Sequence, residues 1–159
     1  MSEAAPILTF RASVPSTASP EAVYDVLSDL RTHLDWAGEQ APDKAFRLLT
    51  MDAPSRPVTV GDRFSSSGAN VNGTFHDGST VVQAERGARF GFDTESTLER
   101  SHGRPWQARF GHRYVLERSG GPVTRVMVQR AMRRNLANLA AMAEGGPRVA
   151  HRPSPHSQR

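Results

Sequence analysis

Near the start of the chain, the segment 7–14 shows an alternation of apolar and polar residues that is regular from Leu8 onward. The apolar side chains stand at every second position: Leu8, Phe10, Ala12 and Val14. A period of two is typical of a strand with one buried face, so this segment is predicted to be a strand that Pro15 ends.

A helix start follows this strand. Ser19 can accept a hydrogen bond from a backbone N–H of the first turn, Pro20 suits the first helical position, and Glu21 complements the positive end of the helix dipole. The next apolar residues fall on one helical face: Val23, Val26, Leu27 and Leu30. A second short helical turn is predicted around Leu34 and Trp36.

From residue 45 onward, short strand-like runs are separated by Gly, Pro, Asn and Asp. Six such runs are predicted to be strands: 45–51, 61–67, 74–85, 88–100, 107–118 and 123–129. The Asp77-Gly78 pair is expected to make an irregularity within the third run. Together the runs predict a curved antiparallel meander.

Helical spacing returns over 131–144, near the end of the chain. One stripe carries Met132, Leu136, Leu139 and Ala143, and two glycines follow as a stop. The last residues contain three prolines and several basic side chains, which cannot bury enough apolar surface to order themselves. We therefore predict a single folded domain over 1–146 and a disordered basic tail over 147–159.

The order of predicted elements is one strand, two helices, six strands and a terminal helix. Five segments carry fold motifs: Ala12–Val14, Ser19–Tyr24, Val60–Phe64, Arg89–Thr94 and His112–Tyr114. With these segments in this order, residues 7–144 resemble the START-like and Bet v 1-like helix-grip superfamily. The resemblance points in particular to its polyketide cyclase and lipid-transport branch, the SRPBCC type.

This resemblance implies an α+β helix-grip fold. A curved antiparallel sheet of about seven strands would wrap on a C-terminal helix, and the cavity between them would hold a small hydrophobic or aromatic molecule. Relatives usually carry a longer terminal helix, whereas a helix of about 14 residues spans only about 21 Å. The cavity is then either incompletely roofed or closed by a partner chain, as in a homodimer.

Strand parity selects the side chains that would face such a cavity. If Phe92 points inward, Thr94 and Ser96 do too, and on the next strand His112 and Tyr114 share one face. The predicted ligand-binding set is Trp36, Phe75, Phe92, Thr94, Ser96, Trp106, Phe110, His112 and Tyr114. An imidazole and a phenol in apolar surroundings can serve as general acid and base, so His112 and Tyr114 are the candidate catalytic residues.

Each of these residues also has a structural interpretation. His112 can fill a polar gap in an ordinary core by bonding to Tyr114, Thr94 or the backbone, and the two tryptophans can be packing residues. Four charged residues of the opposite parity are expected to form cross-strand ion pairs on the solvent face: Asp93, Glu95, Arg109 and Arg113.

The composition of the chain limits the metals, cofactors and partners that can be expected. The 159 residues include no Cys, and no further ligand at a suitable spacing completes a metal site with His76 and Asp77. The net charge is only +4 and no phosphate-binding glycine motif is present, so neither a nucleic acid partner nor a cofactor is predicted. Because no apolar run approaches the roughly 20 residues of a membrane span and no signal peptide is evident, the cytoplasm is the expected location.

Three functions remain open on these grounds. The first is binding of a small hydrophobic or aromatic ligand between the sheet and the C-terminal helix. The second, which the resemblance allows, is a polyketide cyclase-, aromatase- or dehydratase-like enzyme that uses the same cavity. The third is a protein-interaction module. Replacement of His112 by Ala would remove turnover only in the second case, and deletion of 131–144 would abolish a dimer or complex only in the third.

Overall fold

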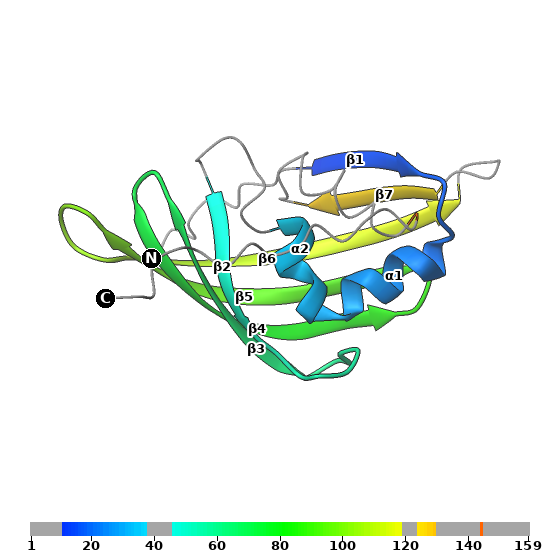
Figure 1. The fold of residues 1–159 in the computed structure, drawn as a ribbon, viewed down its shortest axis with the longest axis horizontal. Coiled ribbons are helices and arrows are strands. Elements are labelled where there is room, and N and C mark those ends of the chain that lie inside the picture. Colours follow the sequence, from blue (N-terminus) through cyan, green and yellow to red (C-terminus); the bar gives the residue numbers. More distant parts are fainter. Residues whose placement is uncertain (1–10, 38–45, 119–123, 130–143, 145–159) are drawn as a thin grey trace, which may run out of the picture.

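The computed structural model describes residues 11–37, 46–118, 124–129 and 144. One layer is an antiparallel sheet, and short helices lie against one of its faces (Figure 1). The strands are β1 (Arg11–Ser16), β2 (Phe46–Asp52), β3 (Arg63–Asn70), β4 (Gly73–Glu85), β5 (Arg89–Arg100), β6 (Trp106–Arg118) and β7 (Thr124–Gln129). The helical segments are α1 (Pro20–Ser28), the 3-10 turn η1 (Leu30–Thr32) and α2 (His33–Ala37).

The predicted α+β class is confirmed, with an antiparallel sheet and two short helices after the first strand. The predicted helix over 131–144 lies outside the described residues except for Glu144. The predicted tail over 147–159 also lies outside them.

The strands lie side by side in chain order from β2 to β7, as a meander requires. β1 then adds to the other side of β7, which gives the order β1-β7-β6-β5-β4-β3-β2. All neighbouring strands are antiparallel. Short loops can join consecutive antiparallel strands, which explains the local order, whereas the β1–β7 pairing brings together segments far apart in the sequence.

Pro15 does not end β1, contrary to the expectation from the sequence. It pairs in register with Arg125 of β7, and the strand continues to Ser16. β1 is an edge strand, and its neighbour needs only every second N–H of such a strand. A proline can therefore occupy a position of β1 whose backbone nitrogen points away from β7 without loss of a hydrogen bond between the two strands.

The irregularity of β4 also lies elsewhere than predicted. Asp77 and Gly78 pair regularly with both neighbouring strands, and the register shifts between Val81 and Gln83 instead. Val81 is 1% exposed and Ala84 also packs against the core, although an odd spacing of three separates them. An extra residue at this point lets both side chains face the core, which regular alternation would forbid.

The start of α1 is confirmed in detail. The Ser19 hydroxyl accepts a hydrogen bond from the N–H of Ala22 at 3.1 Å, and Pro20 occupies the first turn. Three residues of the predicted apolar face have no exposed surface: Val23, Leu27 and Leu30. The face is buried because α1 packs against β5 and β6.

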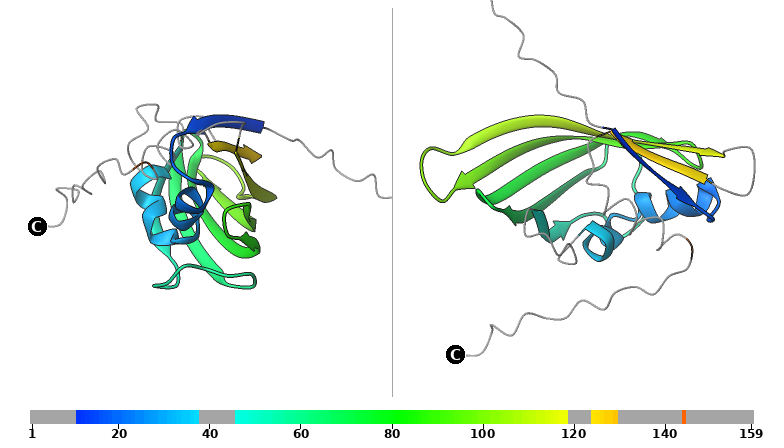
Figure 2. Two further views of the ribbon diagram at one scale, coloured as in Figure 1. Left: turned by 90° about the vertical axis from the view of Figure 1, so that its right-hand side faces the viewer. Right: turned by 90° about the horizontal axis from the view of Figure 1, so that it is seen from above.

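The hydrophobic core lies between the helices and the sheet, which curves over them (Figure 2). Its buried members are Val23, Tyr24, Leu27, Leu30, Trp36, Val58, Phe64, Val81, Phe90, Phe92, Tyr114 and Leu116. Tyr24 of α1 meets Phe90 of β5 edge to face, with ring centroids 6.2 Å apart. Edge-to-face contact is a favoured arrangement of aromatic rings, so it fixes α1 on the sheet.

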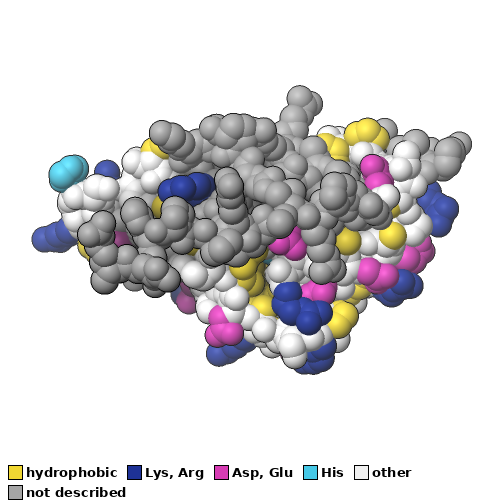
Figure 3. Space-filling model, viewed as in Figure 1, with side chains coloured by type: hydrophobic (Ala, Val, Ile, Leu, Met, Phe, Trp, Pro, Cys, Tyr) yellow, Lys and Arg dark blue, Asp and Glu magenta, His cyan; other side chains and the backbone are white. Residues whose placement is uncertain are grey.

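On the outside, acidic and basic side chains are interspersed over the described part of the face seen in Figure 3. Among the residues that the structure describes, no helix has the length and apolar character needed to cross a membrane.

Candidate functional site

The candidate site lies on the inner face of the sheet, defined as the face that carries Phe90, Phe92 and Thr94 and packs against α1. In the β5–β6 register, Phe92 lies beside His112, and Ser96 lies beside Ala108. Burial follows the same parity, since Phe92 and Thr94 are buried while the intervening Asp93 is exposed. The predicted parity of β5 and β6 is therefore present in the structure.

A pair of hydroxyl groups crosses this face between β4 and β5. The Ser79 and Thr94 side-chain oxygens are 2.8 Å apart, and both residues are buried. Phe64 of β3 and Phe110 of β6 flank the pair in the same cross-strand row. The two hydroxyls therefore satisfy each other within an otherwise aromatic row.

The imidazole of His112 is held between aromatic rings. It stacks on Phe92 with ring centroids 4.6 Å apart and planes at 24°, and Phe110 meets it at 5.4 Å and 70°. His112 as a whole is partly buried, and its Nδ1 atom is buried. This position suits contact with a planar ligand, and it also suits proton transfer to one.

Tyr114 lies deeper than His112 on the same strand. It is 3% exposed, and burial raises the pKa of its phenol above the ordinary value. The phenol is therefore neutral at physiological pH, and in this form it can donate a proton or a hydrogen bond.

The remaining predicted site residues occupy different surroundings. Trp36 is 3% exposed, its indole N–H donates to the Thr32 hydroxyl at 3.3 Å, and its ring lies 4.5 Å from that of His33. Phe75 is buried on the inner face, two rows from Thr94. Trp106, at the start of β6, is 54% exposed. Trp36 thus belongs to the core beneath the helices, and Trp106 belongs to the far end of the sheet.

Two polar residues of the inner face were missed by the sequence analysis. Asp77 and Ser79 alternate with buried Phe75 and Val81 on the same face of β4. The signal was this alternation, and the irregularity expected at Asp77-Gly78 concealed it. Because the strand is regular there, Asp77 lies on the inner face, where Ser96 of β5 donates a hydrogen bond to it.

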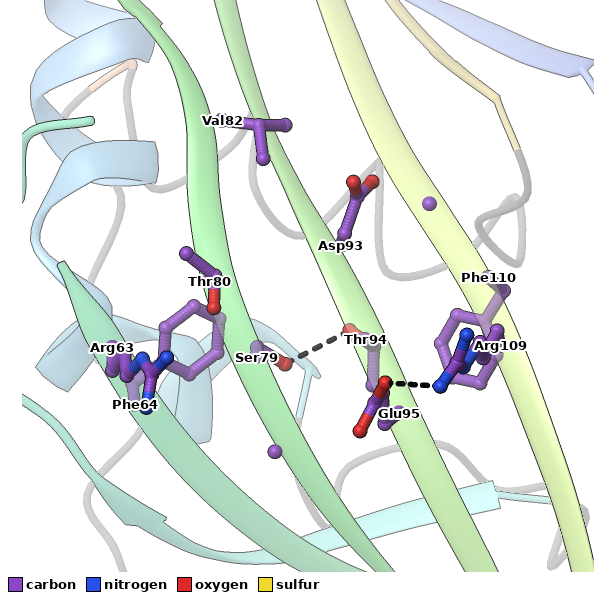
Figure 4. A pocket seen from close by; sticks show the side chains of 12 residues that line it. Arg63, Phe64, Ser79, Thr80, Val82, Asp93, Thr94, Glu95, Arg109 and Phe110 are labelled. Carbon is purple, nitrogen blue, oxygen red and sulfur yellow. Dashed lines mark hydrogen bonds and ion pairs between the residues drawn. The ribbon is translucent and has the colours of Figure 1, made fainter. Parts of the chain in front are cut away.

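The opposite, outer face carries the predicted cross-strand ion pairs. Arg109 contacts Glu95 at 2.9 Å, and Arg113 pairs with Asp93 while also donating to the Phe92 carbonyl oxygen. An open hollow of about 920 Å³ lies along these charges (Figure 4). Its lining residues are Arg63, Phe64, Gly78, Ser79, Thr80, Val82, Asp93, Thr94, Glu95, Arg109, Phe110 and Gly111.

This outer hollow differs from the predicted site in its chemistry. Of the predicted ligand-binding residues, only Thr94 and Phe110 border it, and the rest of the lining is mostly charged or small. Its Glu95 and Asp93 carboxylates already face arginine partners. We therefore place the candidate site on the inner face, where the aromatic rings lie. Within the described residues, no group of three His, Asp or Glu side chains is arranged to hold a metal ion.

Comparison with solved structures shows the same fold. A Chromobacterium violaceum protein matches with a TM-score of 0.60 and 15% identity, covering 87% of this chain and 99% of the other. The AHSA1 protein of Silicibacter pomeroyi matches at 0.59 and 17%, covering 85% and 96%. Ara h 8.0201 matches at 0.54 and 8%, covering 87% and 95%. The chain therefore has the helix-grip fold, as the resemblance implied.

Comparison at the level of sequence adds no closer relationship. No protein-family model matches the chain, and no curated protein matches it.

Proposed function

We propose that the inner face of the sheet, together with a helix over 131–144, encloses a cavity that binds a small hydrophobic or aromatic molecule. In this proposal, all seven strands form the wall and the terminal helix forms the roof. The ligand would contact the aromatic rings of β4, β5 and β6. The predicted residues Phe75, Phe92, Thr94, Ser96 and His112 would line the cavity.

The observation that carries the proposal is the mixture of side chains on this face. Phenyl rings alternate with hydroxyl, carboxyl and imidazole groups, represented by Thr94, Asp77 and His112. A core that only holds a fold together seldom contains so many polar groups, because burying each one costs free energy. A ligand pocket typically has this composition, with an apolar lining and a few polar groups that fix orientation.

The position of Glu144 supports a roof over the inner face. Its carboxylate accepts a hydrogen bond from the N–H of Thr17 at 2.7 Å and another from the side chain of Ser16. β7 ends at Gln129, opposite Arg11 at the other end of β1. The two ends of the segment between Gln129 and Glu144 are therefore about 20 Å apart, the length of β1, and a helix of about 14 residues would span this distance.

Native mass spectrometry of the purified protein, followed by denaturing extraction, tests the proposal directly. We expect an apolar or aromatic molecule to accompany the protein, or the emptied protein to bind the uncharged probe Nile red with increased fluorescence. An empty dimer that binds no probe would contradict the proposal and favour a protein-interaction module.

A pair of variants locates the binding site. Ala108 lies on the inner face beside Ser96, whereas its neighbour Gln107 is exposed and has the opposite parity. Ala108→Phe should therefore weaken probe binding, because the new ring would fill part of the cavity, while Gln107→Phe should not. Equal binding by both folded variants would place the ligand elsewhere.

A second candidate function is catalysis of the cyclase or dehydratase type in the same cavity. The observation that favours it is the imidazole of His112, which lies among aromatic rings on the inner face. Once extraction identifies a ligand class, turnover of that class should be lost in His112→Ala while binding is retained. Undiminished turnover in the variant would exclude His112 as a catalytic residue.

A further inference from the structure

Asp77 stands on the inner face in surroundings that are unusual for a carboxylate. The residues two positions before and after it, Phe75 and Ser79, are 4% and 5% exposed, and Asp77 itself is partly buried. Its cross-strand neighbours are Ser66 of β3 and Ser96 of β5. The carboxylate therefore lies in a row of small hydroxyl side chains, with a phenyl ring on one side of the row.

The carboxylate is only partly satisfied by the described residues. Ser96 donates a hydrogen bond to it, yet its Oδ1 atom is buried and has no hydrogen-bond partner among the described residues. Burial raises the pKa of Asp77, against the opposing effects of Ser96 and of the nearby His76. A buried acceptor without a donor costs free energy, and a carboxylate costs more than a neutral group.

Several other aspartates in the described part of the chain pair with arginine. Asp25 pairs with Arg86 at 2.8 Å, and Asp62 pairs with Arg56 at 2.7 Å. None of the ion pairs found in the described part of the chain includes Asp77. The hydroxyl pair of Ser79 and Thr94 lies in the next row, and neither hydroxyl is a hydrogen-bond partner of Asp77 Oδ1.

We propose that Asp77 is the polar anchor of the cavity and accepts a hydrogen bond from a hydroxyl or protonated amine of the ligand. The inference rests on the proposed function and adds the ligand's chemistry: a hydrogen-bond donor attached to an apolar or aromatic body. The body lies against Phe75 and Phe92, and the donor reaches the carboxylate. Because rotation about the last side-chain bond of Asp is broad, a small turn presents Oδ1 to the donor.

This arrangement also predicts what the cavity rejects. A ligand carboxylate placed in the same row would meet the like charge of Asp77, which disfavours binding. A charge-assisted hydrogen bond from an ammonium is stronger than a neutral one, so the ammonium form should bind at least as well as the hydroxyl form.

Three compounds with one aromatic body test the inference: naphthylmethylammonium, naphthylmethanol and naphthoate. We expect the ammonium and the alcohol to bind the folded protein at least about tenfold more tightly than naphthoate, as a hydrogen bond to a charged group allows. The ratio of ammonium to alcohol affinity identifies which donor the site prefers. Tightest binding of naphthoate would overturn the inference.

Asp77→Asn keeps the size of the side chain and removes its charge. In this variant the preference for the ammonium over naphthoate should fall by about tenfold. The control is Glu99→Gln, which removes the same charge from an exposed residue of opposite parity on β5 and should leave the preference unchanged. An equal loss of preference in both variants would mean that net charge, and not Asp77, sets the selectivity.

The outcomes separate this inference from the proposed function. If all three compounds bind equally to the native protein and to Asp77→Asn, the proposed ligand-binding function is supported and the role of Asp77 is refuted. If neither these compounds nor the uncharged probe Nile red binds, the proposed function itself fails. Circular dichroism and thermal melting check the fold of each variant, and unfolding of Asp77→Asn would make Asp77 a structural residue and overturn the inference.

Discussion

The imidazole of His112 stacks on the phenyl ring of Phe92, with ring centroids 4.6 Å apart and planes at 24°. The two residues are direct cross-strand neighbours on β6 and β5. Their contact joins the candidate catalytic imidazole to one of the aromatic rings of the inner face. The stack therefore fixes the orientation in which His112 would meet a ligand.

The stack should appear as an energetic coupling between the two residues. In a double-mutant cycle of Phe92→Leu and His112→Leu, we expect a coupling of about 0.5–1.5 kcal/mol in the free energy of unfolding. Urea denaturation measures it. A control cycle of Phe92→Leu with His76→Leu should show almost no coupling, because His76 lies on the outer face. Equal coupling in the two cycles would contradict the specific stack.

Two glycines of the sheet should respond in opposite ways to alanine. At Gly68, a Cβ atom would overlap the carbonyl oxygen of Arg47 and the ring of Phe75, whereas at Gly78 it would meet nothing within 4 Å. We expect Gly68→Ala to lower the free energy of unfolding by about 1–3 kcal/mol or more. Gly78→Ala should be neutral or slightly stabilising, since alanine has less backbone freedom to lose. Thermal melting of both variants distinguishes these effects.

His33 should make the protein sensitive to mild acid. Burial lowers the pKa of His33 from 6.5 to about 4, and its Nε2–H donates to the Leu27 carbonyl oxygen over 3.0 Å. Below pH 6.5 the unfolded chain takes up a proton that the folded protein excludes until about pH 4. The stabilisation by neutral His33 is therefore complete above pH 6.5 and is lost as the pH falls, by about 3 kcal/mol at most.

Urea denaturation between about pH 7.5 and about pH 4 measures this effect. The variant His33→Gln keeps a donor for Leu27 and removes the titration, so its stability should fall less steeply over this range. His102→Gln is the control, because His102 is exposed in the β5–β6 loop. Parallel loss of stability in the native protein and His33→Gln would refute the role of His33.

The cap of α1 should contribute measurably to stability. Ser19→Ala removes the acceptor for the N–H of Ala22 and should lower the free energy of unfolding by about 1 kcal/mol. Ser19→Asp should retain the acceptor and lose little. Ser13→Ala, at an exposed position of β1, is the matched control and should be close to neutral. A stability of Ser19→Ala equal to that of the control would show that water replaces the cap without cost.

Among the described residues, local pattern was sufficient to predict the two short helices and the order of the strands. The alternation in β5 and β6 set which side chains share a face, so Thr94 and His112 were placed together correctly. The cap at Ser19 was equally local, because it involves residues three positions apart. The polar row of β4 was misread because Asp77-Gly78 resembles a break, although a glycine without nearby atoms can remain in a regular strand.

The sequence by itself determined the class of the fold, the start of α1, and the faces of the longest strands, since these follow from periodicities of two and 3.6 residues. Only the tertiary structure decided that β1 pairs with β7, that the extra residue of β4 lies next to Val81, and that Trp36 packs under the helices. It also brought Ser96 to Asp77. These features depend on the register between strands and on competition for space in one core, and neither is encoded by a residue's immediate neighbours along the chain.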